Sequence, residues 1–178
     1  MRSRVNLIAV LLLGGCFSYV PVDGQPVFLN VVRAEPARDQ ALLAALPVGG
    51  AYWAPCSVKL AETRESATHV LDVEIVDSLP SDHAGELYTD GLRTRLRFDG
   101  SMLSTFDSMR VQTTVAHELG HAFGLEHVET DAVMYSPIQE HATLTLPDLV
   151  AFRQYTGHAC AAPITSPPIE KIEKGSSF

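Results

Sequence analysis

Hydrophobic residues recur with two different periods along the chain, which predicts both strands and helices. Residues 27–33 are rich in strand-forming side chains, and apolar and polar residues alternate over residues 69–77 and again over residues 92–98. From Asp107 onward, apolar residues instead recur every three or four positions, which is the period of a helix. The pattern favours an α+β fold.

The two alternating segments differ in the charge of their polar positions. Asp72 and Glu74 alternate with the apolar residues of the first segment, whereas Arg93, Arg95 and Arg97 do so in the second. If the two strands are neighbours, these opposite charges favour their pairing. The alternative is two unrelated solvated faces. Residues 57–61 and 85–89 are candidates for further short strands.

An early helix is predicted over residues 37–46. It follows a proline and groups Leu42, Leu43 and Leu46 on one side, and we expect Pro47 to end it.

The helix after residue 107 begins at a capping residue, Asp107 or Ser108. Its core-facing stripe consists of apolar residues at helical spacing, namely Val111, Val115, Leu119 and Ala122.

The N-terminal segment has the layout of an export signal. Two arginines precede an apolar run over residues 5–13 that is too short to span a bilayer. The segment LGGC, which ends at Cys16, resembles a bacterial lipobox, and this resemblance implies cleavage after residue 15 and lipidation of Cys16. The alternative is an ordinary cleaved signal with an unmodified Cys16. If Cys16 is lipidated, residues 16–26 would be a spacer between the lipid anchor and the domain.

Export determines how the other two cysteines are interpreted. Cys56 and Cys160 form an even pair in an oxidising compartment, which indicates a disulfide, and two free buried thiols are the alternative.

The length of 178 residues indicates one domain. The net charge of −8 argues against nucleic acid as a partner, because the phosphate backbone would repel the protein.

The stretch HELGHAFGLEH, residues 117–127, carries the clearest chemistry in the chain. His117 and His121 are four residues apart, which places both imidazoles on one side of a helix. Gly124 can adopt the left-handed conformation that ends a helix, so His127 can approach as a third ligand. Three neutral imidazoles suit zinc and leave a coordination position for water. Glu118 is placed to accept a proton from that water as a general base.

This stretch, followed by the sequence VMY, resembles the metzincin metallopeptidases. The resemblance implies that His117, His121 and His127 bind one catalytic zinc ion, that Glu118 is the base, and that Met134 forms an apolar floor beneath the histidines. Because a tyrosine directly follows Met134, the chain is most similar to the matrixins, although Val128 stands where matrixins usually have serine.

Residues 142–157 are similar to the closing helix of matrixin catalytic domains. Thr145 would cap this helix with Asp148 completing a capping box, and the apolar residues expected to pack inward are Leu149, Phe152 and Tyr155. The resemblance implies a catalytic domain over residues 27–160, in which a mixed, twisted sheet lies over the zinc helix. Residues 161–178 would form a disordered tail.

The matrixin resemblance also implies where a substrate would bind. An extended peptide would pair with the edge strand at residues 85–89, and residues 135–137 would line the pocket for the side chain after the cut. Asp82, His83 and Asp90 only weakly match the loops that hold calcium or a second zinc in animal matrixins. His69, His141 and His158 have no evident partner and are expected at the surface.

The sequence thus predicts a monomeric, zinc-dependent endopeptidase that acts on proteins or peptides. We expect it in the bacterial cell envelope, held by a lipid anchor, and in the outer rather than the inner membrane, since Phe17 replaces the aspartate typical of inner-membrane retention. The alternative is a non-catalytic envelope lipoprotein in which zinc only stabilises the fold.

Overall fold

A computed structural model describes residues 20, 23–80, 83–90, 93–141 and 143–161. The predicted signal peptide, Cys16 and nearly all of the predicted tail lie outside these residues. Within them, five strands and four α-helices form an α+β fold, as the sequence predicted. None of the described helices is both long enough and apolar enough to cross a membrane.

The sheet has the strand order β2-β1-β3-β5-β4. Its strands are β1 (Pro26–Arg33), β2 (Lys59–Leu60), β3 (His69–Val76), β4 (Gly85–Asp90) and β5 (Arg93–Asp99). All pairs are parallel except β4 with β5, which is antiparallel. β4 is therefore an edge strand, where the sequence placed it.

The two oppositely charged strands, β3 and β5, are neighbours in the sheet, as the charge pattern predicted. Asp72 lies opposite Arg95 and Glu74 opposite Arg97 in the parallel register. The Nε atom of Arg97 is 3.3 Å from a carboxylate oxygen of Glu74. The alternative of two unrelated solvated faces is therefore wrong.

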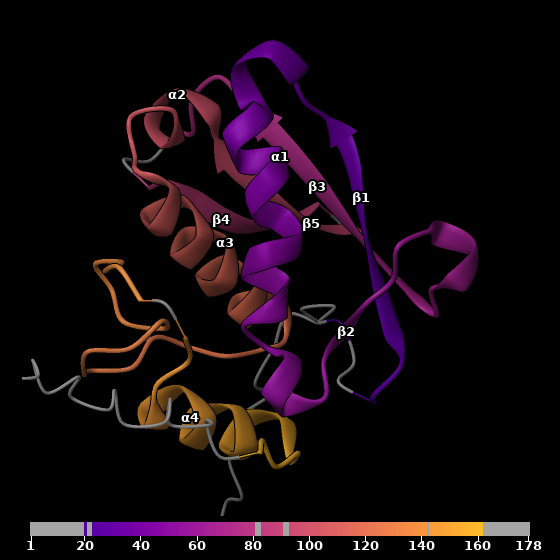
Figure 1. The fold of residues 1–178 in the computed structure, drawn as a ribbon, viewed down its shortest axis with the longest axis vertical. Helices are drawn as coiled ribbons and strands as arrows, with labels where there is room; N and C mark the ends of the chain where they lie inside the picture. Colours follow the sequence, from indigo (N-terminus) through magenta and orange to yellow (C-terminus); the bar gives the residue numbers. More distant parts are fainter. Residues whose placement is uncertain (1–19, 21–22, 81–82, 91–92, 142, 162–178) are drawn as a thin grey trace, which may run out of the picture.

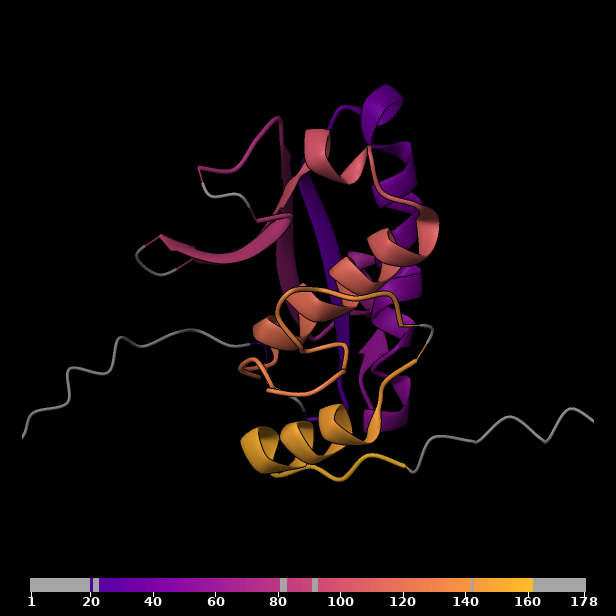
Figure 2. The same ribbon diagram turned by 90° about the vertical axis from the view of Figure 1, so that its left-hand side faces the viewer.

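Two helices cover one face of the sheet, α1 (Pro36–Ala51) and α3 (Ser108–Ala122) (Figures 1 and 2). The prediction that Pro47 ends the first helix is wrong, because α1 continues for another turn. Pro47 itself is exposed, while Gly49 lies so close to α3 that an added Cβ atom would be 2.5 Å from Cγ1 of Val115. Close packing of α1 on α3 thus outweighs the missing backbone donor of the proline.

The helix α3 lies with its apolar stripe in the core. Its four stripe residues are at most 1% exposed, as predicted: Val111, Val115, Leu119 and Ala122. Asp107 caps the helix by accepting a hydrogen bond from the backbone N–H of Arg110 at 3.0 Å. The indole of Trp53 donates to the carbonyl of Ala116 at 2.9 Å and anchors the middle of the helix.

The last helix, α4 (Leu146–Thr156), lies below α3 in Figure 1. Thr145 and Asp148 form the predicted capping box, and Leu149 and Phe152 are buried. Tyr155, however, is 46% exposed, so the prediction that it packs inward is wrong. Its hydroxyl instead donates to the carboxylate of Glu126 at 3.1 Å.

A disulfide fixes the chain just after α4. Cys56, in the short 3₁₀ helix η1 (Ala54–Cys56), is joined to Cys160, which confirms the predicted bridge over the alternative of free thiols. The bond spans 104 positions of the sequence and ties the region after α1 to the end of the domain. A second 3₁₀ helix, η2 (Arg64–Ser66), precedes β3, and the short helix α2 (Gly100–Leu103) follows β5.

Candidate metal centre

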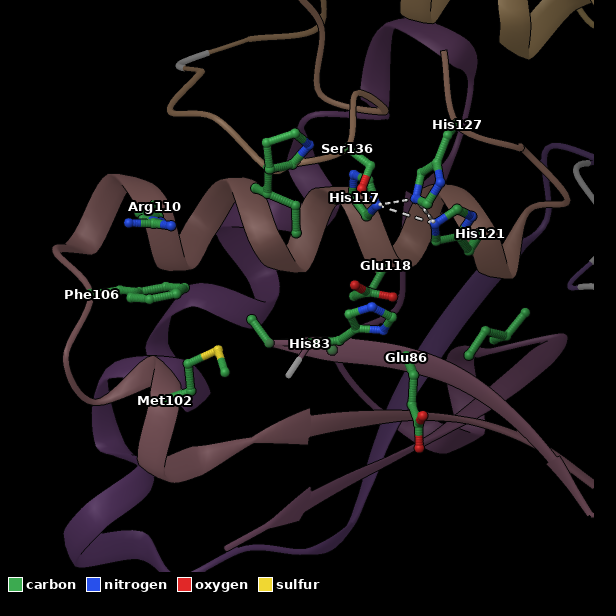
Figure 3. A pocket seen from close by; sticks show the side chains of 15 residues that line it. His83, Glu86, Met102, Phe106, Arg110, His117, Glu118, His121, His127 and Ser136 are labelled. Carbon is green, nitrogen blue, oxygen red and sulfur yellow. Dashed lines mark hydrogen bonds between the residues drawn. The ribbon is translucent and has the colours of Figure 1, made fainter. Parts of the chain in front are cut away.

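A cleft of about 450 Å³ lies between α3, the edge strand β4 and the segment after Met134. The three histidines and Glu118 line it from α3 and the turn that follows, while Gly85 and Leu87 line it from β4 (Figure 3). Sequence segments far apart in the chain thus meet around one cavity, whose size is typical of a ligand site.

The Nε2 atoms of three imidazoles converge at one point. The distances are 3.1 Å from His117 to His127, 3.1 Å from His117 to His121, and 3.2 Å from His121 to His127. Nitrogens bound to one tetrahedral zinc at 2.0–2.1 Å would be separated by roughly 3.3 Å. The observed triangle therefore has the dimensions of a zinc site, and the structure brings together all three predicted ligands.

Backbone carbonyls orient two of these rings. Nδ1 of His117 donates to the carbonyl of Val133 at 2.7 Å, and Nδ1 of His121 donates to the carbonyl of Leu125 at 2.8 Å. A proton on Nδ1 leaves the lone pair of Nε2 free to bind a metal ion. Burial favours the same neutral form, since it lowers the pKa of His117 to about 3 and also lowers that of His121.

The third imidazole reaches the site because the chain turns sharply after α3. Gly124 has a φ of +91°, the left-handed conformation predicted for it. The N–H of Leu125 then bonds back to the carbonyl of Gly120 at 3.0 Å, which closes the turn. His127 follows this turn and completes the triangle.

Glu118 lies beside the histidines and faces β4. The residue is only 4% exposed, and burial, together with the nearby charge of Glu86, raises its pKa to about 8. Gly85 makes room for it, because a Cβ atom at this glycine would be 2.6 Å from Cγ of Glu118. No hydrogen bond within the described part of the chain engages the carboxylate, so it is free to act on a molecule in the cleft.

Met134, the residue expected to form the floor beneath the histidines, is fully buried. Gly120 allows its close approach, because a Cβ atom there would be 2.2 Å from the sulfur of Met134. Asp148, also fully buried, accepts hydrogen bonds from the backbone N–H groups of Val133 and Met134 at 3.1 and 2.9 Å. Sequence reasoning gave Asp148 only a capping role and missed this second one.

The remaining candidate residues are distributed differently from the expectations. Of the residues 135–137 expected to line the pocket for the side chain after the cut, Ser136 and Pro137 line the cleft and Tyr135 does not, while Ile138 also lines it. His83, one of the residues that weakly matched a second ion site, lines the same cleft as Glu118 (Figure 3). Asp82 lies outside the described residues, among which only the histidine triangle forms a group of metal-binding side chains.

Two of the histidines expected without partners do have them. His69 is hydrogen-bonded to Asp23 at 3.0 Å, and Nε2 of His141 lies 3.1 Å from a carboxylate oxygen of Asp131 without hydrogen-bond geometry. The sequence offered no signal for these contacts, because each joins segments that meet only in the fold. His158 is exposed, as expected.

Comparison with known families gives one match for this arrangement. The Matrixin family model matches residues 65–154, which include β3, the whole of α3, the histidine triangle and most of α4. A search of curated proteins finds no match.

Proposed function

The chain belongs to the matrixin family of metallopeptidases, and from this premise we propose that it is a zinc-dependent endopeptidase with Glu118 as its general base. The family match covers 90 of the 178 residues, counted from 65 to 154. One observation carries the proposal: a buried carboxylate without a hydrogen-bond partner among the described residues shares a cleft with three converging imidazoles. Its substrates would be proteins or peptides.

The residues of the cleft divide the chemistry between them. His117, His121 and His127 would hold zinc, which when bound polarises a scissile carbonyl and acidifies water. Glu118 would accept a proton from the attacking water and deliver it to the nitrogen of the leaving amine. Its raised pKa suits both steps, because the group can hold a proton and release it near neutral pH.

The free edge of β4 offers a place for the substrate backbone. β4 pairs with β5 on one side, and Gly85 and Leu87 line the cleft on its other side. An extended peptide could add to this edge as a further strand, which would carry its scissile bond past Glu118.

The decisive test is Glu118→Gln, which keeps the size of the side chain and removes its basicity. General-base assistance contributes about a hundred- to ten-thousandfold in rate, so peptide hydrolysis should fall by that factor while bound zinc stays at about one per chain. Equal rates for the wild type and the variant would rule out Glu118 as the base. If both bind zinc and neither cuts a proteome-derived peptide mixture, the non-catalytic alternative with a structural zinc is favoured.

We further propose that the protein is exported and anchored in the bacterial cell envelope through a lipid on Cys16. The support is the LGGC segment after an apolar run, together with the disulfide between Cys56 and Cys160, which is typical of proteins in an oxidising compartment. The variant Cys16→Ser should leave the membrane fraction or keep its signal uncut. Unchanged partitioning with normal processing would contradict the anchor, and fractionation of the wild type would show which membrane holds it.

A further inference from the structure

The end of the cleft away from the histidines carries a positively charged group. Arg110, in the first turn of α3, lines this end of the cleft together with Met102 and Phe106 (Figure 3). Both of these neighbours are apolar, so this end combines apolar walls with a cationic side chain. The mechanism of bond cleavage gives Arg110 no role.

The guanidinium of Arg110 is positioned by stacking on an aromatic ring and not by an ion pair with an acidic residue among the described residues. It lies over the ring of Phe106, 4.1 Å from the ring centre. Stacking occupies the flat face of the group and leaves its in-plane N–H donors available for a carboxylate. Among the described residues, no ion pair involves Arg110, as is also true of Arg64, Arg93 and Arg153.

The position of Arg110 sets how far a recognised group lies from the scissile bond. It precedes His117 by seven residues, which is about 10 Å along a helix axis. An extended chain covers that distance in roughly three residues. A substrate that runs from the histidines toward the start of α3 would therefore reach Arg110 within three residues of the cut.

We propose that Arg110 is a specificity-determining residue that selects substrates with an acidic side chain within three residues of the scissile bond, on the side facing the start of α3. The apolar walls would pack on the stem of a glutamate, and the guanidinium would bind its carboxylate. This inference rests on the proposed endopeptidase function. Because Arg110 is exposed and Asp107 caps α3 next to it, the preference should be modest, about three- to tenfold.

The test is charge reversal in the full-length protein, Arg110→Glu. Cleavage rates would be measured with a peptide library in which each position around the scissile bond is varied over all amino acids. The wild type should favour Glu over Gln and Lys at one position within three residues of the scissile bond. The variant should lose this preference and favour Lys there, and both preferences should weaken in high salt. The variant is expected to fold, since an acidic residue in the first helical turn interacts favourably with the helix dipole.

A matched control separates local recognition from a change in net charge. Arg64→Glu makes the same change on the exposed 3₁₀ helix η2, outside the cleft, and should leave the preference unaltered. An acidic preference that is absent in the wild type, or that survives in Arg110→Glu, would overturn the inference. Loss of all cleavage in Glu118→Gln with no change of preference in Arg110→Glu would leave the proposed function standing and remove only this inference.

Discussion

The two walls of the cleft hold their functional groups in different ways. On the metal-binding wall, His117 is 2% exposed, Met134 and Asp148 are fully buried, and backbone carbonyls hold the imidazole rings. On the opposite wall, β4 is paired only with β5, and its Tyr88 is 40% exposed. Buried contacts therefore fix most of the groups proposed for chemistry, with the exposed His127 as the exception, whereas the strand proposed to bind the substrate backbone is a partly open edge.

This difference follows from what each wall must do. Metal ligands need a fixed geometry, which buried hydrogen bonds supply. A wall that receives an extended chain must keep its backbone groups accessible, so it cannot be buried in the same way. Substitutions on the metal-binding wall should therefore have large effects, and those on the β4 wall smaller ones except at Gly85, which touches Glu118.

The largest effect is expected for His121→Ala, which removes one side of the imidazole triangle. Even the loss of a group that merely orients a ligand costs about ten- to a hundredfold in metal affinity, so loss of a ligand should cost more. Metal analysis after dialysis should show about one zinc in the wild type and almost none in the variant. His158→Ala changes an exposed histidine outside the cleft and should keep its zinc; equimolar zinc in His121→Ala would contradict the assignment.

The next largest effect is expected for Asp148→Ala. Its carboxylate accepts four hydrogen bonds, from the backbone N–H groups of Val133, Met134 and Thr145 and from the hydroxyl of Thr145. Their loss leaves buried donors unpaired and should lower the free energy of unfolding by about 3–5 kcal/mol.

Urea denaturation would measure this loss. Asp131→Ala, at a side chain that is 75% exposed, is the matched control and should cost less than about 1 kcal/mol. Equal destabilisation by the two variants would show that the turn at Met134 is not held by Asp148.

The metal triangle could be predicted from the sequence because its geometry is local. His117 and His121 share one helix, and Gly124 turns the chain within the next few residues, so spacing alone fixes the arrangement. The hydrogen bonds of Asp148 to Val133 and Met134 and the contact of Gly85 with Glu118 are different. They join segments that are distant in sequence, and no periodicity or spacing signals them.

Two local rules gave wrong results for a physical reason. Pro47 is a strong helix breaker, but packing of Gly49 on Val115 continues α1 beyond it. Tyr155 has the helical spacing of a core residue, yet α4 buries only a narrow face around Leu149 and Phe152. In both cases tertiary packing, which the sequence does not display, decides the outcome.

The same small substitution should have different consequences on the two walls. In Gly85→Ala, the new methyl group would displace Glu118, whose Cγ atom lies 2.6 Å from the Cβ position. Since a shift of about 1 Å can cost a hundredfold in rate, kcat should fall about ten- to a hundredfold while zinc is retained.

In Gly120→Ala, the methyl group would meet the sulfur of Met134 at 2.2 Å and the ring of Trp53 at 2.9 Å. Overpacking of this kind costs about 1–3 kcal/mol, so the main effect should be on stability. Thermal melting and steady-state kinetics of both variants would separate the two outcomes. A normal kcat in Gly85→Ala would show that this glycine does not position the base.

The smallest effect is expected for the ion pair of Arg97 and Glu86, which joins β5 to β4. Their side chains are 20% and 28% exposed, and their nearest charged atoms are 2.9 Å apart. Glu74 also approaches Nε of Arg97, but without hydrogen-bond geometry, so that contact is only ionic. Solvent screens such pairs, and a double-mutant cycle with Glu86→Gln and Arg97→Gln should give a coupling of about 0.5 kcal/mol that declines in 1 M salt. A salt-independent coupling of about 2 kcal/mol or more would instead mean that β4 is held as firmly as the metal-binding wall, and the contrast between the two walls would then fail.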